Sequence, residues 1–494
     1  MKKILLCASG LLLTCSIQAQ SVTDALLYGL DNTNGTARFR AMGGAFGALG
    51  ADMSALSLNP AGSALLTYNQ GAATLSSVNS SAKSVYFGTN AKNSDSTIDL
   101  NQAGAVWVFT DKSGKSDWKS FSLAINYENQ NNFLNAQTAV GTNPTTSIDS
   151  YFLDFAQGIP FGIIANNNFL DLTYQEQQAW LGYEGFIINP NTDNTSYSSN
   201  LTAQSNFFQR NTVLANGLNG KLSFNIASSY KDRIYIGLNL NSHFTDYTRT
   251  SSFYEDYRNS PGHDNSNGLQ NVNFINELYT YGNGFSFQVG AIGKVTKNFR
   301  LGASYQSPTW LRLTDENRQT LRVTTDEQGG FFADPNVTII YPVYRLRTPS
   351  RLGLSAAYVF GKHGSLSFDY GRKDYGNSTF TTSSLFFDQQ NQNIEQLLTA
   401  ANEYRAGGEF NVKQWSIRAG YRLEESPYKD SRTLGDVTMY SGGLGYNFRH
   451  FRIDLAYTLM RREAATGFFE QGLTNPAQYR LKNNNVSVSC VFAL

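Results

Sequence analysis

Charged residues and long hydrophobic runs are both scarce in this sequence. Asp, Glu, Lys and Arg make up 16% of the 494 residues, against roughly 25% in typical soluble domains. Beyond the N-terminus, no stretch approaches the roughly 18 apolar residues that a transmembrane helix needs. The 39 Lys and Arg balance 38 Asp and Glu, so the chain lacks the basic surface that nucleic acid requires. These absences favour a β-barrel that crosses a membrane with strands.

Residues that build metal and catalytic sites are also scarce. The chain has three cysteines and four scattered histidines, and it contains no His-x-x-x-His, Cys-x-x-Cys or Gly-x-Ser-x-Gly motif. We therefore expect no catalytic residues, no metal, no cofactor and no enzymatic activity. His243 shares a strand face with Asn239 and Asn241, and we interpret it as a hydrogen-bonded residue of the barrel interior. A hydrolase base or a haem ligand is the weaker interpretation.

Residues 1–19 predict a secretory signal peptide. Two lysines precede an apolar stretch over 4–17, and Ala19 is the small residue before the cleavage point. A lipoprotein signal that ends at Cys15 is the weaker alternative. Cleavage after Ala19 leaves Cys490 as the single cysteine, so the mature chain forms no internal disulfide.

From residue 71 onward, apolar side chains recur at every second position. Clear examples are 121–127, 234–240, 451–459 and 486–494, in which the intervening residues are mostly Gly, Ala, Ser, Asn or charged residues. This pattern is typical of strands with one face in lipid and the other in a wet interior. It predicts an all-β fold, a transmembrane antiparallel barrel of fourteen strands, with these segments: 71–88, 103–111, 118–128, 215–230, 232–248, 280–296, 298–312, 345–360, 364–378, 402–412, 414–425, 436–449, 450–462 and 480–494.

The connections between these segments alternate in length, as periplasmic turns and external loops do in outer-membrane barrels. This alternation predicts that both ends of the barrel domain, 71–494, lie on the periplasmic side and that the last strand closes the barrel. The short connections are 111–117, 231–232, 296–298, 361–364, 413–414 and 449–450. The long ones are 89–102, 129–214, 249–279, 313–344, 379–401, 426–435 and 463–479.

Residues 20–70, which we call the hatch, lack the strand pattern. They begin with an amphipathic piece and continue through a run of small residues over 42–50, which permits close backbone packing. Asp52 stands where a helix N-cap is expected, and Asn59 and Pro60 follow that short helix. A barrel of fourteen strands has an interior too wide for wall side chains alone to fill. We therefore expect the hatch inside the barrel.

Residues 51–62, which end in Asn-Pro-Ala-Gly, resemble the hatch signature of the FadL family of outer-membrane transporters for long-chain fatty acids and other hydrophobic compounds. The resemblance implies a hatch folded into the barrel, a ligand held beside it, and exit through a gap in the wall. It implies a ligand-gating role for Asn59, Pro60, Ala61 and Gly62. The alternative is that Asn59 only caps a helix and Pro60 only stiffens a turn.

The external loop 129–214 is unusually apolar for a segment in water. Among its apolar residues, Trp180 and Phe186 are candidates for external capture of a hydrophobic ligand, because exposed apolar patches often mark binding surfaces. The alternative, that the loop packs on a core of its own, carries equal weight.

Charged residues of the later strands fall on the lumen side by parity. Mixed signs on adjacent strands predict a paired ladder that braces wall and hatch. A more specific possibility is that Arg405 and Arg422, which lie mid-strand, bind a fatty-acid carboxylate through paired hydrogen bonds, with Glu409 competing for them. The full set is Arg351, Asp369, Arg405, Glu409, Arg418, Arg422, Arg452 and Asp454.

The strand pattern predicts an outer-membrane barrel, and the resemblance implies that it takes up hydrophobic small molecules, such as long-chain fatty acids, by diffusion. We expect it to be monomeric. Its expected partners are the ligand, outer-membrane lipid and the barrel-assembly machinery, for which Phe492 keeps the outward parity of an assembly signal. Two alternatives come from other classes. One is a non-transport barrel that binds secreted proteins, like the related shuttle of the type IX secretion system. The other, an outer-membrane hydrolase, needs a serine or carboxylate beside His243.

Overall fold

The computed structural model describes residues 21–494 apart from 114, 265–267, 326–329 and 449. The predicted signal peptide, 1–19, lies outside the described residues. Within the described residues, no helix is both long and apolar enough to cross a membrane.

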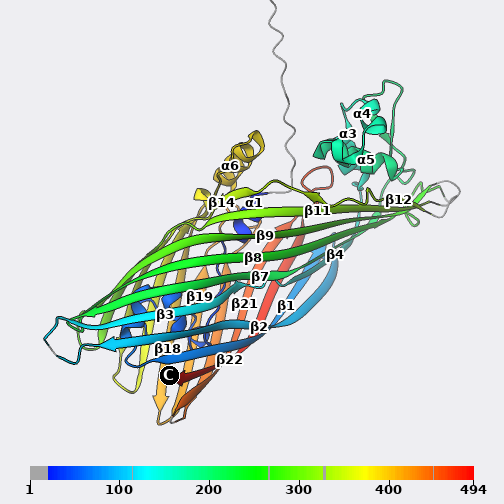
Figure 1. Cartoon of the computed structure of the whole chain (residues 1–494). Coiled ribbons are helices and arrows are strands. Elements are labelled where there is room, and N and C mark those ends of the chain that lie inside the picture. Colours follow the sequence, from blue (N-terminus) through cyan, green and yellow to red (C-terminus); the bar gives the residue numbers. More distant parts are fainter. Residues whose placement is uncertain (1–20, 114, 265–267, 326–329, 449) are drawn as a thin grey trace, which may run out of the picture.

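The described strands form a closed antiparallel barrel of fourteen strands, as the sequence pattern predicts (Figure 1). The last strand pairs with the first over nearly its whole length, from Gln70 opposite Ala493 to Val85 opposite Gln478. Three of the fourteen wall strands are interrupted, as β3 with β4, as β10 with β11 and as β14 with β15. In chain order the wall consists of β1 (Gln70–Tyr86), β2 (Thr89–Thr110), β3 (Trp118–Asn131), β4 (Asn135–Asn143), β7 (Phe207–Tyr230), β8 (Ile234–Asp256), β9 (Leu269–Lys294), β10 (Phe299–Gln306), β11 (Trp310–Thr325), β14 (Tyr344–Arg347), β15 (Arg351–Val359), β16 (Gly364–Asp374), β18 (Ala400–Val412), β19 (Trp415–Glu424), β20 (Val437–Asn447), β21 (Phe451–Thr466) and β22 (Ala477–Ala493).

Side-chain parity along the wall follows the prediction. On β3, Leu123 and Ile125 are exposed on the outer face, whereas Ala124 between them and Ser122 and Asn126 on either side are buried. An alternation of this kind is what lipid on one side and a filled lumen on the other impose. The same outward apolar set continues through Ile234, Ile236, Leu238, Leu240, Phe451, Ile453, Leu455, Tyr457, Val486, Val488 and Phe492.

One predicted external loop, 89–102, is wrong. Strand β2 begins at Thr89, directly after a turn at Phe87 and Gly88, and pairs with β1 along this whole stretch. The outer half of this hairpin extends beyond the apolar belt and carries residues such as Lys92 and Asp95, both exposed. Since neither face of that half meets lipid, it lacks the apolar alternation by which the sequence reveals a strand.

Other strands are also longer on the loop side than predicted. In place of the expected loop 129–214, β3 runs to Asn131, β4 occupies Asn135–Asn143 and β7 starts at Phe207, which leaves 144–206 as the loop. The predicted strands 298–312 and 345–360 are each broken at a proline, Pro308 and Pro349, because proline cannot donate a ladder hydrogen bond. Those two breaks lie side by side and are bridged by Thr348 N donating to Thr309 O (3.0 Å).

A break of a different kind separates β2 from the β3–β4 strand. Their backbone ladder runs from Thr110 opposite Ser120 to Gln102 opposite Glu128, and above that level β3 and β4 pair with β7. Residues 132–134 interrupt the strand there. Side chains span the break: Asn132 Nδ2 donates to Asp99 Oδ2 (2.6 Å) and Asn93 Nδ2 to Thr138 Oγ1 (3.0 Å).

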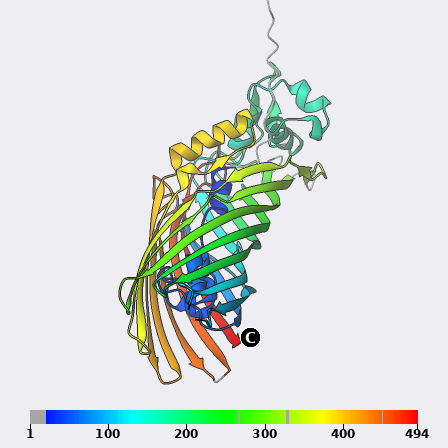
Figure 2. The same cartoon turned by 60° about the vertical axis from the view of Figure 1, so that its left-hand side comes forward.

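The hatch lies inside the barrel and follows most of its length (Figure 2). Its first helix, α1 (Val22–Leu27), begins with a capping box at Ser21 and packs at the loop end of the barrel, whereas the chain's C-terminus lies at the opposite end (Figure 1). Helix α2 (Ala37–Ala41) packs on β19–β22, and the short helices η1 (Met53–Ser57) and η2 (Pro60–Leu65) pack on β2, β3 and β7–β9. Asp52 caps η1 by accepting from Ser54 N, as expected from the sequence.

The remaining elements lie at the loop end. The segment after β4 folds into α3 (Asp149–Ala156), α4 (Phe161–Asn166), η3 (Phe169–Asp171), α5 (Tyr174–Glu184), β5 (Ile188–Pro190) and β6 (Tyr197–Ser199). Helix α6 (Leu385–Leu397) packs against α1 through Phe386, Phe387 and Ile394. Short pieces complete the chain: β12 (Phe331–Ala333), β13 (Ile339–Ile340), η4 (Tyr375–Asn377) and β17 (Thr379–Phe380).

Candidate functional site

The Asn59–Gly62 turn is fixed to the wall by the side chain of Asn59. This residue caps η2, because its Oδ1 accepts from Ala61 N (3.1 Å), and Pro60 occupies the first turn of that helix, where its missing N–H costs nothing. The amide of Asn59 also donates to Gly47 O (2.9 Å) in the hatch and Ala291 O (3.0 Å) in β9. Asn59 therefore joins two parts of the hatch to the barrel wall.

The wall is shaped to receive this turn. A Cβ atom on Gly290 would stand 2.1 Å from Asn59 Oδ1, and one on Gly237 would stand 2.4 Å from the carbonyl carbon of Pro60. Asn225 Nδ2 on β7 donates to Pro60 O (2.9 Å). Only glycine at these two wall positions allows the backbones to approach so closely. These contacts show that the turn is packed tightly against β7, β8 and β9. A gating role for Asn59, Pro60, Ala61 and Gly62 stays a prediction.

Arg405 and Arg422 lie opposite each other on β18 and β19, and their side chains converge as predicted. The group between them is Glu403 of this chain, whose Oε1 accepts from Arg405 Nε (2.8 Å) and Arg422 Nε (2.5 Å). Glu424 and Arg351 extend the cluster through Arg422 Nη2 to Glu424 Oε2 (2.5 Å) and Arg351 Nη2 to Glu403 Oε2 (2.6 Å). Carboxylate binding by the two arginines stays a prediction, and a ligand would have to displace Glu403.

Glu409 is not the competitor for these arginines that the sequence suggested. It accepts instead from Arg38 Nε of the hatch (2.9 Å) and from Arg418 Nε (2.6 Å). Arg418 continues to Asp454 Oδ1 (2.7 Å), which is completely buried, and Asp454 also accepts from Arg452 (2.7 Å). This series of ion pairs forms the predicted brace between wall and hatch. Its hatch member, Arg38, was not predicted, because strand parity gives no information about residues outside the strands.

A second charged contact ties the hatch to the wall above this level. Asp31 Oδ2 lies 2.6 Å from Lys373 Nζ and 3.9 Å from Arg351 Nη1. Burial alone raises the pKa of Asp31, but the charges of Lys373 and Arg351 outweigh it and lower the pKa to about 2. The carboxylate therefore stays ionised and holds this segment of the hatch against the wall.

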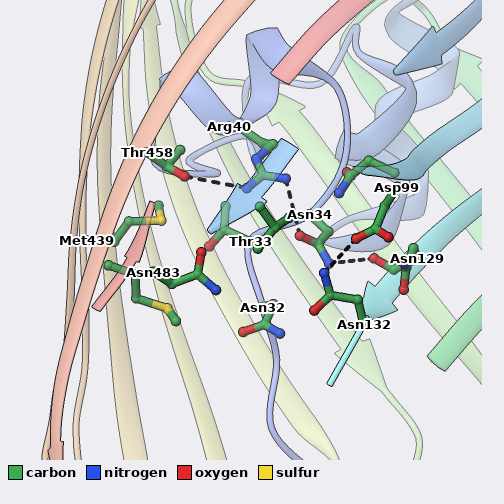
Figure 3. A pocket seen from close by; sticks show the side chains of 13 residues that line it. Asn32, Thr33, Asn34, Arg40, Asp99, Asn129, Asn132, Met439, Thr458 and Asn483 are labelled. Atoms are coloured by element: carbon green, nitrogen blue, oxygen red, sulfur yellow. Dashed lines mark hydrogen bonds between the residues drawn. The ribbon is translucent and has the colours of Figure 1, made fainter. Parts of the chain in front are cut away.

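Two neighbouring cavities lie between the hatch and the wall, beside the break between β2 and β3–β4. The larger, of about 260 Å³, lies at the loop end and is partly open. Its lining combines apolar side chains such as Leu27, Leu30 and Val437 with polar and charged ones such as Asp31 and Arg462. The smaller, about 40 Å³, lies deeper and is lined mainly by Asn and Thr side chains around Arg40 (Figure 3). They share four lining residues: Asn32, Asn132, Met460 and Asn483.

The predicted capture residues lie in the external loop and differ in their surroundings. Most apolar residues of that loop form one buried cluster with the outer ends of β8, β9 and β11, and Trp180 packs on its edge with its ring 5.1 Å from that of Phe169. The alternative of a loop with its own core thus describes this segment. Phe186 has 42% of its surface exposed, and its role in capture stays a prediction.

His243 has a serine neighbour, the condition set for a hydrolase. Its Nε2 lies 2.8 Å from Ser286 Oγ on β9, and its Nδ1 lies 3.1 Å from Gln130 Oε1. Ser286 is completely buried and also accepts from Asn241. A buried hydroxyl beside an amide gives a polar network of the interior, since a hydrolase needs an accessible nucleophile and commonly a carboxylate to orient its histidine.

Comparison with known proteins decides the class of this barrel. Residues 16–494 match the family described as outer membrane protein transport protein (OMPP1/FadL/TodX). The chain belongs to the OMPP1/FadL/TodX family. It is accordingly an outer-membrane β-barrel, a channel for hydrophobic compounds and not an enzyme.

Solved structures of this family have the same fold at low sequence identity. A Pseudomonas aeruginosa FadL homologue is similar with a TM-score of 0.54 and 14% identity, over 94% of this chain and 99% of that chain. The P. putida toluene transporter TodX is similar with a TM-score of 0.50 and 15% identity, over 94% and 99%. The CymD monoaromatic hydrocarbon channel gives 0.50 and 13%, over 94% and 99%. No curated protein matches this chain.

Proposed function

We propose that this family member carries amphipathic hydrophobic molecules, with long-chain fatty acids as the substrate class, by passive diffusion. The observation that carries the proposal is the pair of neighbouring cavities beside the break in the wall, which share four lining residues. The apolar part of the larger cavity's lining suits a hydrocarbon chain, and the polar inner cavity suits a headgroup. An aromatic hydrocarbon has no polar headgroup to place in the inner cavity.

In this proposal the route begins at the external loops, where Phe186 and Trp180 would meet a ligand. The ligand then enters the larger cavity between α1 and the wall. Movement of the hatch at Asn59–Gly62 releases it from the inner cavity, and it leaves sideways between β2 and β4 once the side chains across the break separate. Entry is favourable for an apolar ligand, because burial of its hydrocarbon chain replaces contact with water.

Uptake by whole cells tests the substrate class. Cells that express the protein should accumulate labelled hexadecanoate several-fold faster than cells that carry an empty vector, and they should gain less for toluene. The reason is that only the fatty acid uses both the apolar and the polar cavity. A larger gain for toluene, or no gain for either compound, contradicts the assignment.

The sideways route is testable through the two residues that span the break. With Cys490 replaced by serine, Asp99→Cys and Asn132→Cys can be linked by a short reducible reagent that reacts with two thiols. Linking should abolish most of the uptake of hexadecanoate, because it fixes β2 to the β3–β4 strand, and reduction should restore it.

The matched control links a pair away from the break, Ser120→Cys with Ser229→Cys, which lie opposite each other in the continuous ladder of β3 and β7. This link should leave uptake unchanged. Equal uptake in all linked proteins argues for a route straight through the barrel.

A second candidate, binding of secreted proteins as in the type IX shuttle, is favoured by the folded external elements. They expose apolar side chains on α6 and around α5, namely Leu170, Phe186, Leu385 and Leu397, and such patches often bind partners. Affinity purification of the protein from its native membrane separates the two functions. Stoichiometric co-purification of a secreted protein, together with no effect of the gene on fatty-acid uptake, favours the shuttle.

A further inference from the structure

Arg40 is buried in the barrel without a counter-ion. It comes from helix α2 of the hatch, only 4% of it is exposed, and among the described residues no carboxylate forms an ion pair with it. Its hydrogen bonds are long: Nη1 donates to Asn34 Oδ1 (3.3 Å) and Ser76 Oγ (3.5 Å), and Nη2 to Thr458 Oγ1 (3.4 Å). Its Nε has no partner in the described part of the chain.

Three other arginines of the interior have carboxylate partners. Arg38, two residues earlier on the same helix, binds Glu409, and Arg418 and Arg422 each bind two carboxylates. Asp99 lines the same cavity as Arg40 but forms no ion pair with it, and its Oδ2 already accepts a hydrogen bond from Asn132. A buried cation without a partner is costly, so the arrangement is explained if an anion from outside the chain completes it.

The space around Arg40 suits a small anion. The inner cavity of about 40 Å³ exceeds the roughly 10–15 Å³ that a single water needs. Figure 3 shows the guanidinium of Arg40 beside Asn34 and Thr458, at one side of a group of mainly amide and hydroxyl side chains that also contains the carboxylate of Asp99. Nε–H and a neighbouring Nη–H form the edge of a guanidinium that binds a carboxylate through two parallel hydrogen bonds.

We propose that Arg40 is the anion-binding residue of the ligand path and holds the carboxylate of an amphipathic ligand whose hydrocarbon chain lies in the larger cavity. The inference rests on the proposed function for its ligand. It differs from that function because it assigns recognition to one hatch residue rather than to the wall arginines Arg405 and Arg422, which Glu403 already occupies. Since Arg40 belongs to the hatch, the ligand's charge contacts the element whose movement opens the channel.

Binding to the purified full-length protein tests this assignment with two ligands of equal chain length, hexadecanoate and hexadecanol. Arg40→Met should weaken binding of hexadecanoate about tenfold or more, because a neutral chain of similar length cannot replace the paired hydrogen bonds. Binding of hexadecanol should change less than about twofold. Arg40→Lys, which keeps the charge but loses the planar donor edge, should lie between wild type and Arg40→Met.

Controls separate failure of this inference from failure of the proposed function. Arg480→Met removes an arginine whose side chain is 82% exposed and should leave both affinities unchanged. If wild type binds neither ligand, the proposed function fails. If wild type binds both and Arg40→Met weakens both equally, or neither, Arg40 is not the anion site.

Two further measurements keep the test decisive. Heat-modified mobility on gels shows whether each variant has folded, and Arg40→Lys carries the comparison if Arg40→Met does not fold. Acetate titrated against bound hexadecanoate distinguishes the source of the anion. Displacement of the fatty acid from wild type, less from Arg40→Lys and not from Arg40→Met supports a ligand carboxylate at Arg40. Tight binding of acetate alone, with no effect on hexadecanoate, assigns the site to a free small anion.

Discussion

Replacing Gly290 with alanine is expected to dislodge the Asn59–Gly62 turn and leave the channel permanently leaky. The added Cβ would stand 2.1 Å from Asn59 Oδ1 and 2.8 Å from Pro60 Cδ, which is closer than a Cβ atom can approach an atom to which it is not bonded. The methyl group meets the cap and the proline of η2 rather than a mobile side-chain end, so the turn itself must move. Overpacking of this kind typically costs about 1–3 kcal/mol.

Permeability of whole cells measures the effect. Cells with Gly290→Ala should take up a hydrophilic antibiotic several-fold faster than wild type, while the barrel still assembles, because β9 keeps its ladder bonds with β8 and β10. Pro60→Ala should act in the same direction more weakly, since it frees φ at one position without a clash. The leak of each variant therefore reports how strongly that substitution weakens the contact between hatch and wall.

Gly293 provides a matched control on the same strand. An added Cβ there meets nothing within 4 Å, so Gly293→Ala should leave permeability and stability unchanged. A leak in both variants would indicate a general effect of side chains on β9. A tight barrel in Gly290→Ala, with normal uptake, would reduce the turn to a brace with no part in gating.

Strand parity was predictable here because the membrane itself imposes it. Lipid requires an apolar side chain at each outward position, so segments such as 234–240 reveal both the strand and its two faces, and Arg405 and Arg422 fall on the lumen side as expected. The same logic fails where lipid is absent. The outer half of β2, with Lys92 and Asp95 exposed, has the composition of a loop although it is fully paired with β1.

Contacts between the hatch and the wall were beyond prediction from the sequence. The pairing of Arg38 with Glu409 joins residues 371 positions apart, and nothing local in 36–41 indicates which wall residue faces each hatch residue. Glu403, which the predicted set of lumen residues omitted, is different, because it lies two residues from Arg405 and therefore has the same strand parity. The position of Glu403 in the lumen could thus be read from the sequence. What the sequence analysis did not consider is that Glu403 pairs with Arg405 on its own strand.

Glu403→Gln is expected to destabilise the barrel more than any other single change in the ladder. The carboxylate lies within 2.7 Å of three arginines, Arg351, Arg405 and Arg422, and all three are paired to it in the interior. A glutamine keeps the shape but leaves buried positive charges uncompensated. Breaking a buried pair in this way typically costs about 3–5 kcal/mol, which should lower the midpoint of urea unfolding clearly.

Glu463→Gln is the control for this change. Glu463 pairs with Arg480 at 3.3 Å, but both side chains are more than three-quarters exposed, at 77% and 82%, so its loss should cost roughly 0–1 kcal/mol. Comparison of Glu403→Gln with wild type also decides whether Arg405 and Arg422 bind ligand or only brace the wall. If these arginines bind ligand, Glu403→Gln removes their internal competitor and should tighten binding of hexadecanoate despite the lower stability. If they only brace the wall, fatty-acid affinity should stay at the wild-type value while stability falls, and recognition of the carboxylate is left to Arg40.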